Sequence, residues 1–187
     1  PGELRRLFWG LCTHLGTPLF QNTTGEIIGE VKDETGVGAA ITGGGPGPVP
    51  SARARSRSTG PLRWHTDKCD LLCLLCASNG IAGGVSRLVS TVAIHDEIGR
   101  RRPDLLRVLY EDFWRMRPGD EEGTEGLHFN DRVFRMPVFA RGPNGDFTSQ
   151  YSRTYVEMAH EQPGVPPMRP DQKEALDLLA AVAEELC

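Results

Sequence analysis

The chain has 187 residues, 39% of them hydrophobic and 25% charged, which suffices for one folded domain with a sizeable core. Its formal net charge of −4 argues against a nucleic-acid partner, and no apolar run approaches the ~20 residues needed to cross a membrane. The five cysteines are an odd number, which favours a reducing cytoplasm over a disulfide framework. We therefore expect a cytoplasmic protein that binds neither nucleic acid nor a membrane, and the sequence leaves its oligomeric state open.

The first part of the chain alternates between apolar segments and a long polar loop. Residues 3–15 predict an amphipathic helix, because apolar side chains recur every three or four positions. Residues 26–31 have the pattern of a short strand. Residues 41–61 consist mainly of Gly, Pro, Ser and Arg and predict a flexible loop. Residues 62–77 are rich in apolar side chains and favour a buried strand, with a helix possible on length alone.

Helix signals follow in the middle of the chain. Leu88 and Val89 predict a short strand, and Ser90 is a good N-cap for a helix reaching Ile98. Pro103 suits the first turn of a second helix, predicted over residues 105–113.

The last part of the chain predicts two strands and a helix. The strands span residues 134–139 and 147–151, on either side of a turn at residues 142–145. Residues 171–186 show an apolar stripe at helical spacing. The elements together indicate an α+β protein.

The tripeptide His65-Thr66-Asp67 carries the chemistry. In a strand, residues two positions apart face the same side, so the imidazole of His65 and the carboxylate of Asp67 would lie side by side. One neutral nitrogen and one anionic oxygen are two of the three ligands of a 2-His-1-carboxylate iron centre. On its own the tripeptide is weak evidence, because a histidine beside an acid is more often an ordinary surface or core pair.

The residues around the tripeptide make the pattern more specific. An apolar run follows Asp67, then Gly83-Gly84-Val85-Ser86, then the helix opening at Ser90. Further matching segments are Arg102-Pro103-Asp104-Leu105-Leu106, Tyr151-Ser152-Arg153-Thr154-Tyr155 and Gln172-Lys173-Glu174-Ala175-Leu176. In motif, order and spacing, most of residues 55–187 resembles the TauD/TfdA family of Fe(II)- and 2-oxoglutarate-dependent dioxygenases.

The resemblance implies a fold, cofactors and site residues. The expected core is a double-stranded β-helix (a cupin-like jelly roll) flanked by helices, present in part in a single domain over residues 1–187. His65 and Asp67 would bind Fe(II), and Ser86 would contact the 2-oxoglutarate carboxylate. The expected reaction uses dioxygen and 2-oxoglutarate to hydroxylate a small organic substrate, whose identity the sequence does not reveal.

The family's third iron ligand, a distal histidine followed by an arginine, is not found in this sequence. His128 lies in a polar stretch, and His160 aligns with a structural segment of the family. The final helical pattern has no C-terminal cap before Cys187, so we expect a fragment that lacks both residues. Such a fragment would bind iron weakly and be inactive alone.

Two other kinds of metal site are possible on residue spacing alone. Cys69, Cys73 and Cys76 have the spacing of a radical-SAM iron–sulfur site, but packing in a core is the favoured role of these thiols. The pair Glu157 and His160 has the spacing of a di-iron motif, yet the second copy that such a site needs is missing, so an ordinary exposed pair is expected.

A non-catalytic homologue or binding module is the remaining alternative. Arginines at positions 53, 55 and 57 and at 100–102 could form a basic patch. Without interleaved aromatic residues, and in an acidic chain, they are expected to be solvated surface. The resemblance to the TauD/TfdA family suggests a further hypothesis, that Arg53, Arg55 and Arg57 meet an anionic substrate or cosubstrate at the mouth of the active site.

Overall fold

The computed structural model describes residues 2–21, 26–29, 62–79, 85–116 and 132–187. Its helices are α1 (Gly2–Cys12), α4 (Thr91–Arg101), α5 (Pro103–Leu109), α7 (Arg153–His160) and α8 (Pro170–Leu186). Its strands are β1 (Phe113–Met116), β2 (Val133–Met136), β3 (Phe139–Arg141) and β4 (Phe147–Ser149). The predicted loop at 41–61, with its three arginines, lies outside the described residues, as do Gly83, Gly84 and His128.

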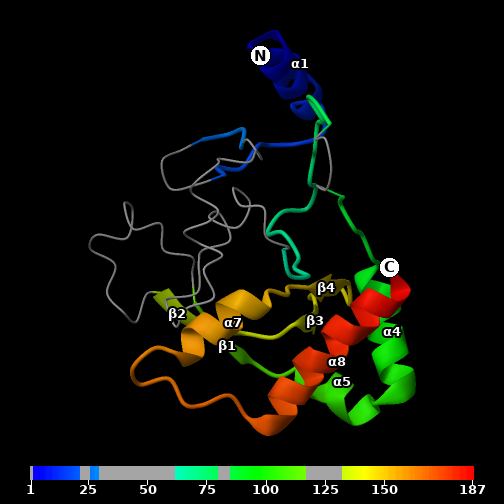
Figure 1. Ribbon diagram of the computed structural model, residues 1–187, viewed down its shortest axis with the longest axis vertical. Coiled ribbons are helices and arrows are strands. Elements are labelled where there is room, and N and C mark those ends of the chain that lie inside the picture. The colour runs from blue at the N-terminus through cyan, green and yellow to red at the C-terminus, as the bar shows by residue number, and fades with distance from the viewer. Residues whose placement is uncertain (1, 22–25, 30–61, 80–84, 117–131) are drawn as a thin grey trace.

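Helices α4, α5 and α8 pack against one another and hold most of the hydrophobic core (Figure 1). Ser90 caps α4 as predicted, since its hydroxyl accepts a hydrogen bond from the Ala93 amide at 3.3 Å. Pro103 occupies the first turn of α5, where its missing N–H costs no helical hydrogen bond. The fully buried side chains of this group include Ile98, Leu109, Leu176 and Val182.

The described strands form two separate two-stranded antiparallel sheets. β1 pairs with β2, and β3 pairs with β4 across the predicted turn, where Gly145 adopts a φ of +84° that favours glycine. The strand predicted over residues 134–139 is two strands, because Pro137 has no N–H to continue the ladder. The helix predicted to reach residue 113 ends at Leu109, and Phe113 begins β1 instead.

Helix α7, which the sequence analysis did not predict, packs against β1. It begins at Arg153, directly after Ser152. It buries Thr154, Val156 and Ala159. With 8 residues it is shorter than the window of about 11–18 residues over which a helical period is recognised in a sequence.

The segment 62–79 is not the buried strand that its composition predicted. Only His65 makes a β-bridge, to Ser152, and the rest of the segment is irregular. Its leucines are exposed, with Leu74 at 70%. A strand needs a hydrogen-bonding neighbour, and within the described residues none accompanies the segment beyond Thr66. Residues 26–29 and the predicted strand at 88–89 are irregular as well.

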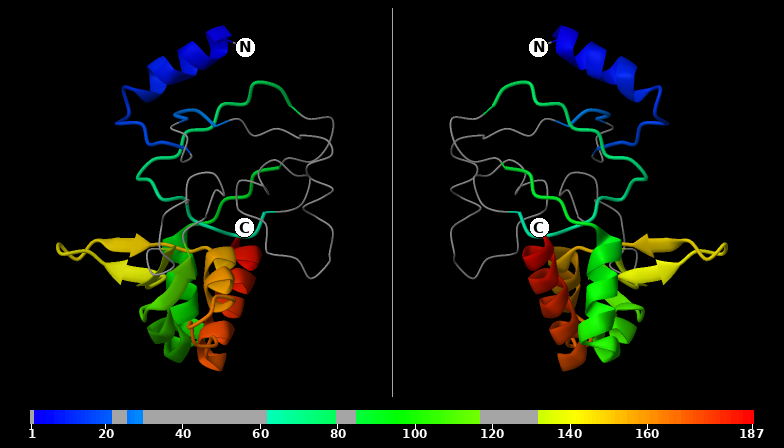
Figure 2. Two further views of the ribbon diagram at one scale, coloured as in Figure 1. Left: turned by 90° about the vertical axis from the view of Figure 1, so that its left-hand side faces the viewer. Right: turned by 90° about the vertical axis from the view of Figure 1, so that its right-hand side faces the viewer.

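Helix α1 confirms the amphipathic helix expected at the start of the chain, although it ends at Cys12 and is followed by a turn. None of its residues is buried. It lies away from the group formed by α4, α5 and α8 (Figures 1 and 2). None of the helices in the described ranges is long and apolar enough to cross a membrane.

Helices and antiparallel strands occur together, as the α+β expectation requires. The double-stranded β-helix is not seen: the strands of the described residues form two small sheets and no closed barrel. The jelly roll therefore stays a prediction for this chain.

Candidate metal centre

The side chains of His65 and Asp67 lie next to each other on the outer side of the segment 62–67. The His65 Nε2 atom and the Asp67 Oδ1 atom are 3.9 Å apart, and the side chains are 41% and 47% exposed. Trp64 and Thr66 are half-buried, so side chains alternate between the two sides of the backbone. The local backbone thus has the alternation of a strand although it pairs at only one residue.

Thr66 anchors this segment to the core. Its amide donates to the Tyr151 carbonyl at 2.8 Å, and its hydroxyl accepts from the Tyr151 amide at 2.8 Å. Tyr151 is buried, with 5% of its surface exposed. Because both hydrogen bonds belong to the residue between His65 and Asp67, they fix the backbone that presents the two candidate ligands.

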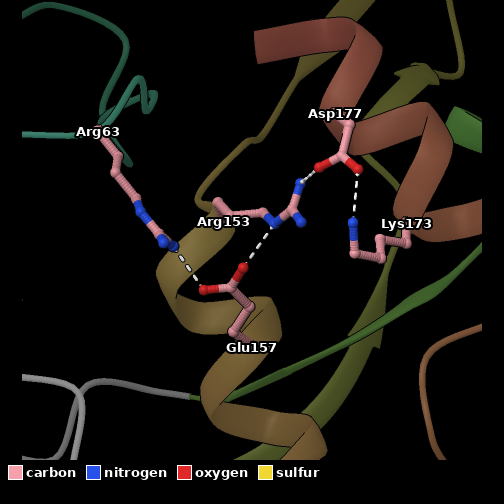
Figure 3. Close-up of polar contacts among 5 residues, drawn as sticks. All are labelled: Arg63, Arg153, Glu157, Lys173 and Asp177. Carbon is pink, nitrogen blue, oxygen red and sulfur yellow. Dashed lines mark hydrogen bonds and ion pairs between the residues drawn. The ribbon is translucent and has the colours of Figure 1, made fainter.

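A chain of ion pairs joins Arg63 of this segment to helices α7 and α8 (Figure 3). Arg63 binds Glu157 on α7, and Glu157 binds Arg153 at 2.7 Å. Arg153 then reaches Asp177 on α8 at 2.8 Å, and Lys173 binds the second oxygen of that carboxylate. Burial would raise the pKa of Glu157, but the two guanidinium groups outweigh it and hold that pKa below its ordinary value.

The imidazole of His65 is oriented for binding through Nε2. Its Nδ1 lies 2.8 Å from the Arg63 carbonyl oxygen. Because a carbonyl only accepts hydrogen bonds, Nδ1 is the donor in this contact, and in the neutral imidazole the lone pair is then on Nε2, which faces Asp67. Holding a ligating histidine by its other nitrogen in this way is the usual arrangement at metal sites.

The two side chains fit a metal ion in chemistry and nearly in distance. An imidazole nitrogen and a carboxylate oxygen are the donors that Fe(II) takes in a facial triad. Two neighbouring ligands at ~2.1 Å from one ion lie roughly 3 Å apart. The His65 Nε2 and Asp67 Oδ1 atoms, 3.9 Å apart, would have to approach each other by a little under one ångström to bind one ion. Rotation of the two half-exposed side chains allows this.

The described residues supply two ligands here and no third. No group of three or more His, Cys, Asp and Glu side chains able to hold a metal occurs within the described ranges. His95 uses its two nitrogens toward Asp96 and Tyr110, each at 2.9 Å. His160 lies at the end of α7, with its Nδ1 2.6 Å from the Pro166 carbonyl oxygen.

A small pocket opens beside His65. Its volume is about 100 Å³, and its walls are largely apolar. Phe139, Leu179 and Ala183 contribute to the walls, and Arg87 also lines it. Asp67 is not among the lining residues, so the two candidate ligands do not share one closed cavity.

Ser86 belongs to the irregular stretch before α4, and its side chain is exposed. In the described part of the chain the Ser86 hydroxyl makes no hydrogen bond with His65 or Asp67, but its neighbours Arg87 and Leu88 line the same pocket as His65. The three predicted site residues therefore lie on two segments that border one pocket.

The cysteines are not packed in a core as predicted. Cys69 and Cys76 are exposed, and Cys73 is half-buried. Cys76 donates to the Asn79 side chain at 3.2 Å, while Cys73 contacts Cys12. The strand expected to bury these residues did not form, and the three thiols do not gather into a metal-binding group.

Two predicted groups of polar side chains form ion pairs in the structure. Glu157 and His160 are half-buried, not the exposed pair expected, because Glu157 is tied to Arg63 and Arg153. The arginines at 100–102 are paired with carboxylates of the helices, such as Glu97. Sequence reasoning missed Arg63, Tyr151 and the role of Glu157, since nothing local marks a partner so distant in the chain.

Comparison with protein-family models gives one match, to the taurine catabolism dioxygenase TauD, TfdA family, over residues 2–187. A search of curated proteins gives no match. The family match takes in the candidate ligands, Ser86 and nearly all of the described elements. The chain belongs to the TauD/TfdA family.

Proposed function

We propose that this chain is part of an Fe(II)- and 2-oxoglutarate-dependent oxygenase that hydroxylates a small organic substrate. His65 and Asp67 bind the metal, and Ser86 donates a hydrogen bond to 2-oxoglutarate. Membership of the TauD/TfdA family, whose members are dioxygenases of this kind, supports the reaction class. The observation that carries the residue assignment is the 3.9 Å approach of His65 Nε2 to Asp67 Oδ1 on an anchored backbone.

Each residue has a definite part in the proposal. Bound Fe(II) with 2-oxoglutarate would supply the activation of dioxygen and the oxidation of a C–H bond. His65 offers its Nε2 nitrogen, since Nδ1 donates a hydrogen bond to the Arg63 carbonyl. Asp67 adds a negative charge that partly neutralises the metal. The apolar pocket beside His65 gives a water-poor surface against which part of the substrate packs.

Two ligands alone hold a metal weakly, and the described residues supply no third beside them. In the isolated chain we expect weak metal binding and no turnover. Turnover is expected in protein that includes the third ligand. If metal binds at His65 but 2-oxoglutarate is never consumed in such protein, the chain is a non-catalytic homologue instead.

Metal binding tests the two ligands directly. Co(II) is titrated into the chain under nitrogen, and visible absorption follows its coordination. His65→Ala and Asp67→Ala should each weaken Co(II) binding by about tenfold or more. His14→Ala and Asp70→Ala are matched controls, since both side chains are exposed and outside the motif, and should change the affinity less than twofold or so.

The result that contradicts the assignment is equal Co(II) affinity in wild type, His65→Ala and Asp67→Ala. A second measurement is formation of succinate from 2-oxoglutarate with iron and ascorbate in protein that includes the third ligand. There, loss of succinate in His65→Ala but not in His14→Ala supports the catalytic role of the site.

A further inference from the structure

One carboxylate lies between the segment that carries His65 and the segment that carries Ser86. Glu184 of α8 accepts a hydrogen bond from Trp64 Nε1 at 3.1 Å through Oε2. Its other oxygen, Oε1, accepts from Arg87 Nη1 at 2.6 Å. Trp64 directly precedes His65 in the sequence, and Arg87 directly follows Ser86.

The two segments also touch each other. The guanidinium of Arg87 lies over the Trp64 ring, 5.2 Å from its centroid. A cation above the face of an indole is attracted by the negative charge of the ring. Trp64, Arg87 and Glu184 therefore form a closed triangle of contacts, which we call the Glu184 clamp.

The helix under the clamp is fixed by the core. Val182 and Ala183, the residues before Glu184, are buried, and Ala183 lines the same pocket as His65. Packing thus sets the position of the helix backbone at Glu184, while the two segments that its carboxylate contacts have little regular secondary structure of their own. Arg87 also contacts Cys187 at the end of this helix.

We propose that Glu184 is a positioning residue that holds the His65 segment and the Ser86 segment in a fixed relative position beside the pocket. The metal ligands His65 and Asp67 lie on one segment, whereas 2-oxoglutarate would depend on both segments, through the metal on the first and Ser86 on the second. Loss of the clamp therefore affects 2-oxoglutarate binding far more than metal binding. The catalytic consequence rests on the proposed function, but the mechanical link between the segments does not.

The clamp is exposed, with Glu184 58% and Arg87 45% accessible, so its effect is local. Exposed ion pairs contribute little to global stability. What a shared carboxylate with two donors provides is a restriction on the relative movement of the segments. Glu184→Ala should leave the unfolding midpoint nearly unchanged while the backbone near Trp64 and Arg87 opens more often.

Hydrogen exchange in the metal-free protein tests the link without reference to activity. In Glu184→Ala, amides of residues 63–66 and 86–89 should exchange about threefold faster or more, in both segments together. Glu184→Gln keeps an acceptor for Trp64 and should rescue the first segment in part. Glu185→Ala is the matched control, because this neighbouring carboxylate on α8 pairs with Arg101 on α4 at 2.6 Å.

Exchange that rises in only one segment, in neither, or equally in Glu185→Ala overturns the clamp. The second arm measures Mn(II) and 2-oxoglutarate affinity under nitrogen in protein that includes the third ligand. We expect 2-oxoglutarate binding to weaken at least about fivefold in Glu184→Ala, with Mn(II) affinity within about twofold of wild type. Equal loss of both overturns the positioning role. Wild-type protein that binds no 2-oxoglutarate refutes the proposed function alone, since the exchange result still decides the link.

Discussion

Replacing Thr66 by valine tests whether one side chain anchors the candidate metal segment. Valine keeps the shape and the β-branching of threonine but removes the hydroxyl. The Thr66 Oγ1 atom accepts a hydrogen bond from the Tyr151 amide at 2.8 Å. In the variant the amide of the buried Tyr151 loses this acceptor. The second hydrogen bond, from the Thr66 amide to the Tyr151 carbonyl, remains.

The expected loss of stability follows from that one unpaired donor. Leaving a buried donor without an acceptor costs about 1–3 kcal/mol, and we expect the lower half of this range because the site is only partly buried. For a chain of this size, about 1–2 kcal/mol corresponds to a fall in Tm of roughly 2–8 °C. The fall would be measured by urea and thermal unfolding, with exchange of the Tyr151 amide as a local readout.

Thr148→Val is the matched control. Its hydroxyl is exposed and donates to the Ala140 carbonyl at 3.4 Å, so its removal should cost less than about 0.5 kcal/mol. A Thr66→Val variant with the same midpoint as Thr148→Val, and with an unchanged Tyr151 amide, would refute the anchoring role of Thr66.

Three further changes probe the rest of the molecule. Leu176→Ala empties a fully buried site in α8 and should lower the free energy of unfolding by about 2–5 kcal/mol, against less than about 1 kcal/mol for Leu186→Ala, both measured in urea. Ser90→Ala removes the cap of α4 and should cost about 1 kcal/mol in the same assay, without altering the α8 core. The pKa of Glu157 is held below its ordinary 4.5, so its ion pairs should stabilise the fold above pH 4.5 and lose this effect as the pH falls. Glu157→Gln should therefore show a smaller drop in the urea midpoint between about pH 6 and pH 3 than wild type does. An equally steep drop in the variant would contradict this stabilising effect.

Local sequence signals predicted local structure well. Ser90, Pro103 and Gly145 each act through the backbone of their own turn, and each lies where the sequence placed it. The alternation around His65 also depends only on an extended backbone. These features need no knowledge of distant partners, which explains why a single sequence suffices for them.

Features that depend on a distant partner could not be predicted. The apolar run after Asp67 suggested burial, but burial needs a surface to pack on, and in the described residues these leucines have none. Likewise, the anchor of Thr66 lies 85 residues away, and the partner of Arg63 lies 94 residues away. Periodicity tells which side of a segment is apolar, and it does not tell which element will face that side.

The candidate ligands are held by contacts of two physical kinds, and this division bears on how the site can work. The Thr66–Tyr151 hydrogen bonds are partly buried and join uncharged groups. They therefore hold the segment against the core at any salt concentration. The contacts of Arg63 and Trp64 with carboxylates of α7 and α8 are exposed, and salt screens them. The backbone between His65 and Asp67 is therefore fixed, while the side chains of Arg63 and Trp64 on its N-terminal side can shift. A site that must close from 3.9 Å onto a metal needs this combination of a rigid middle and adjustable flanks.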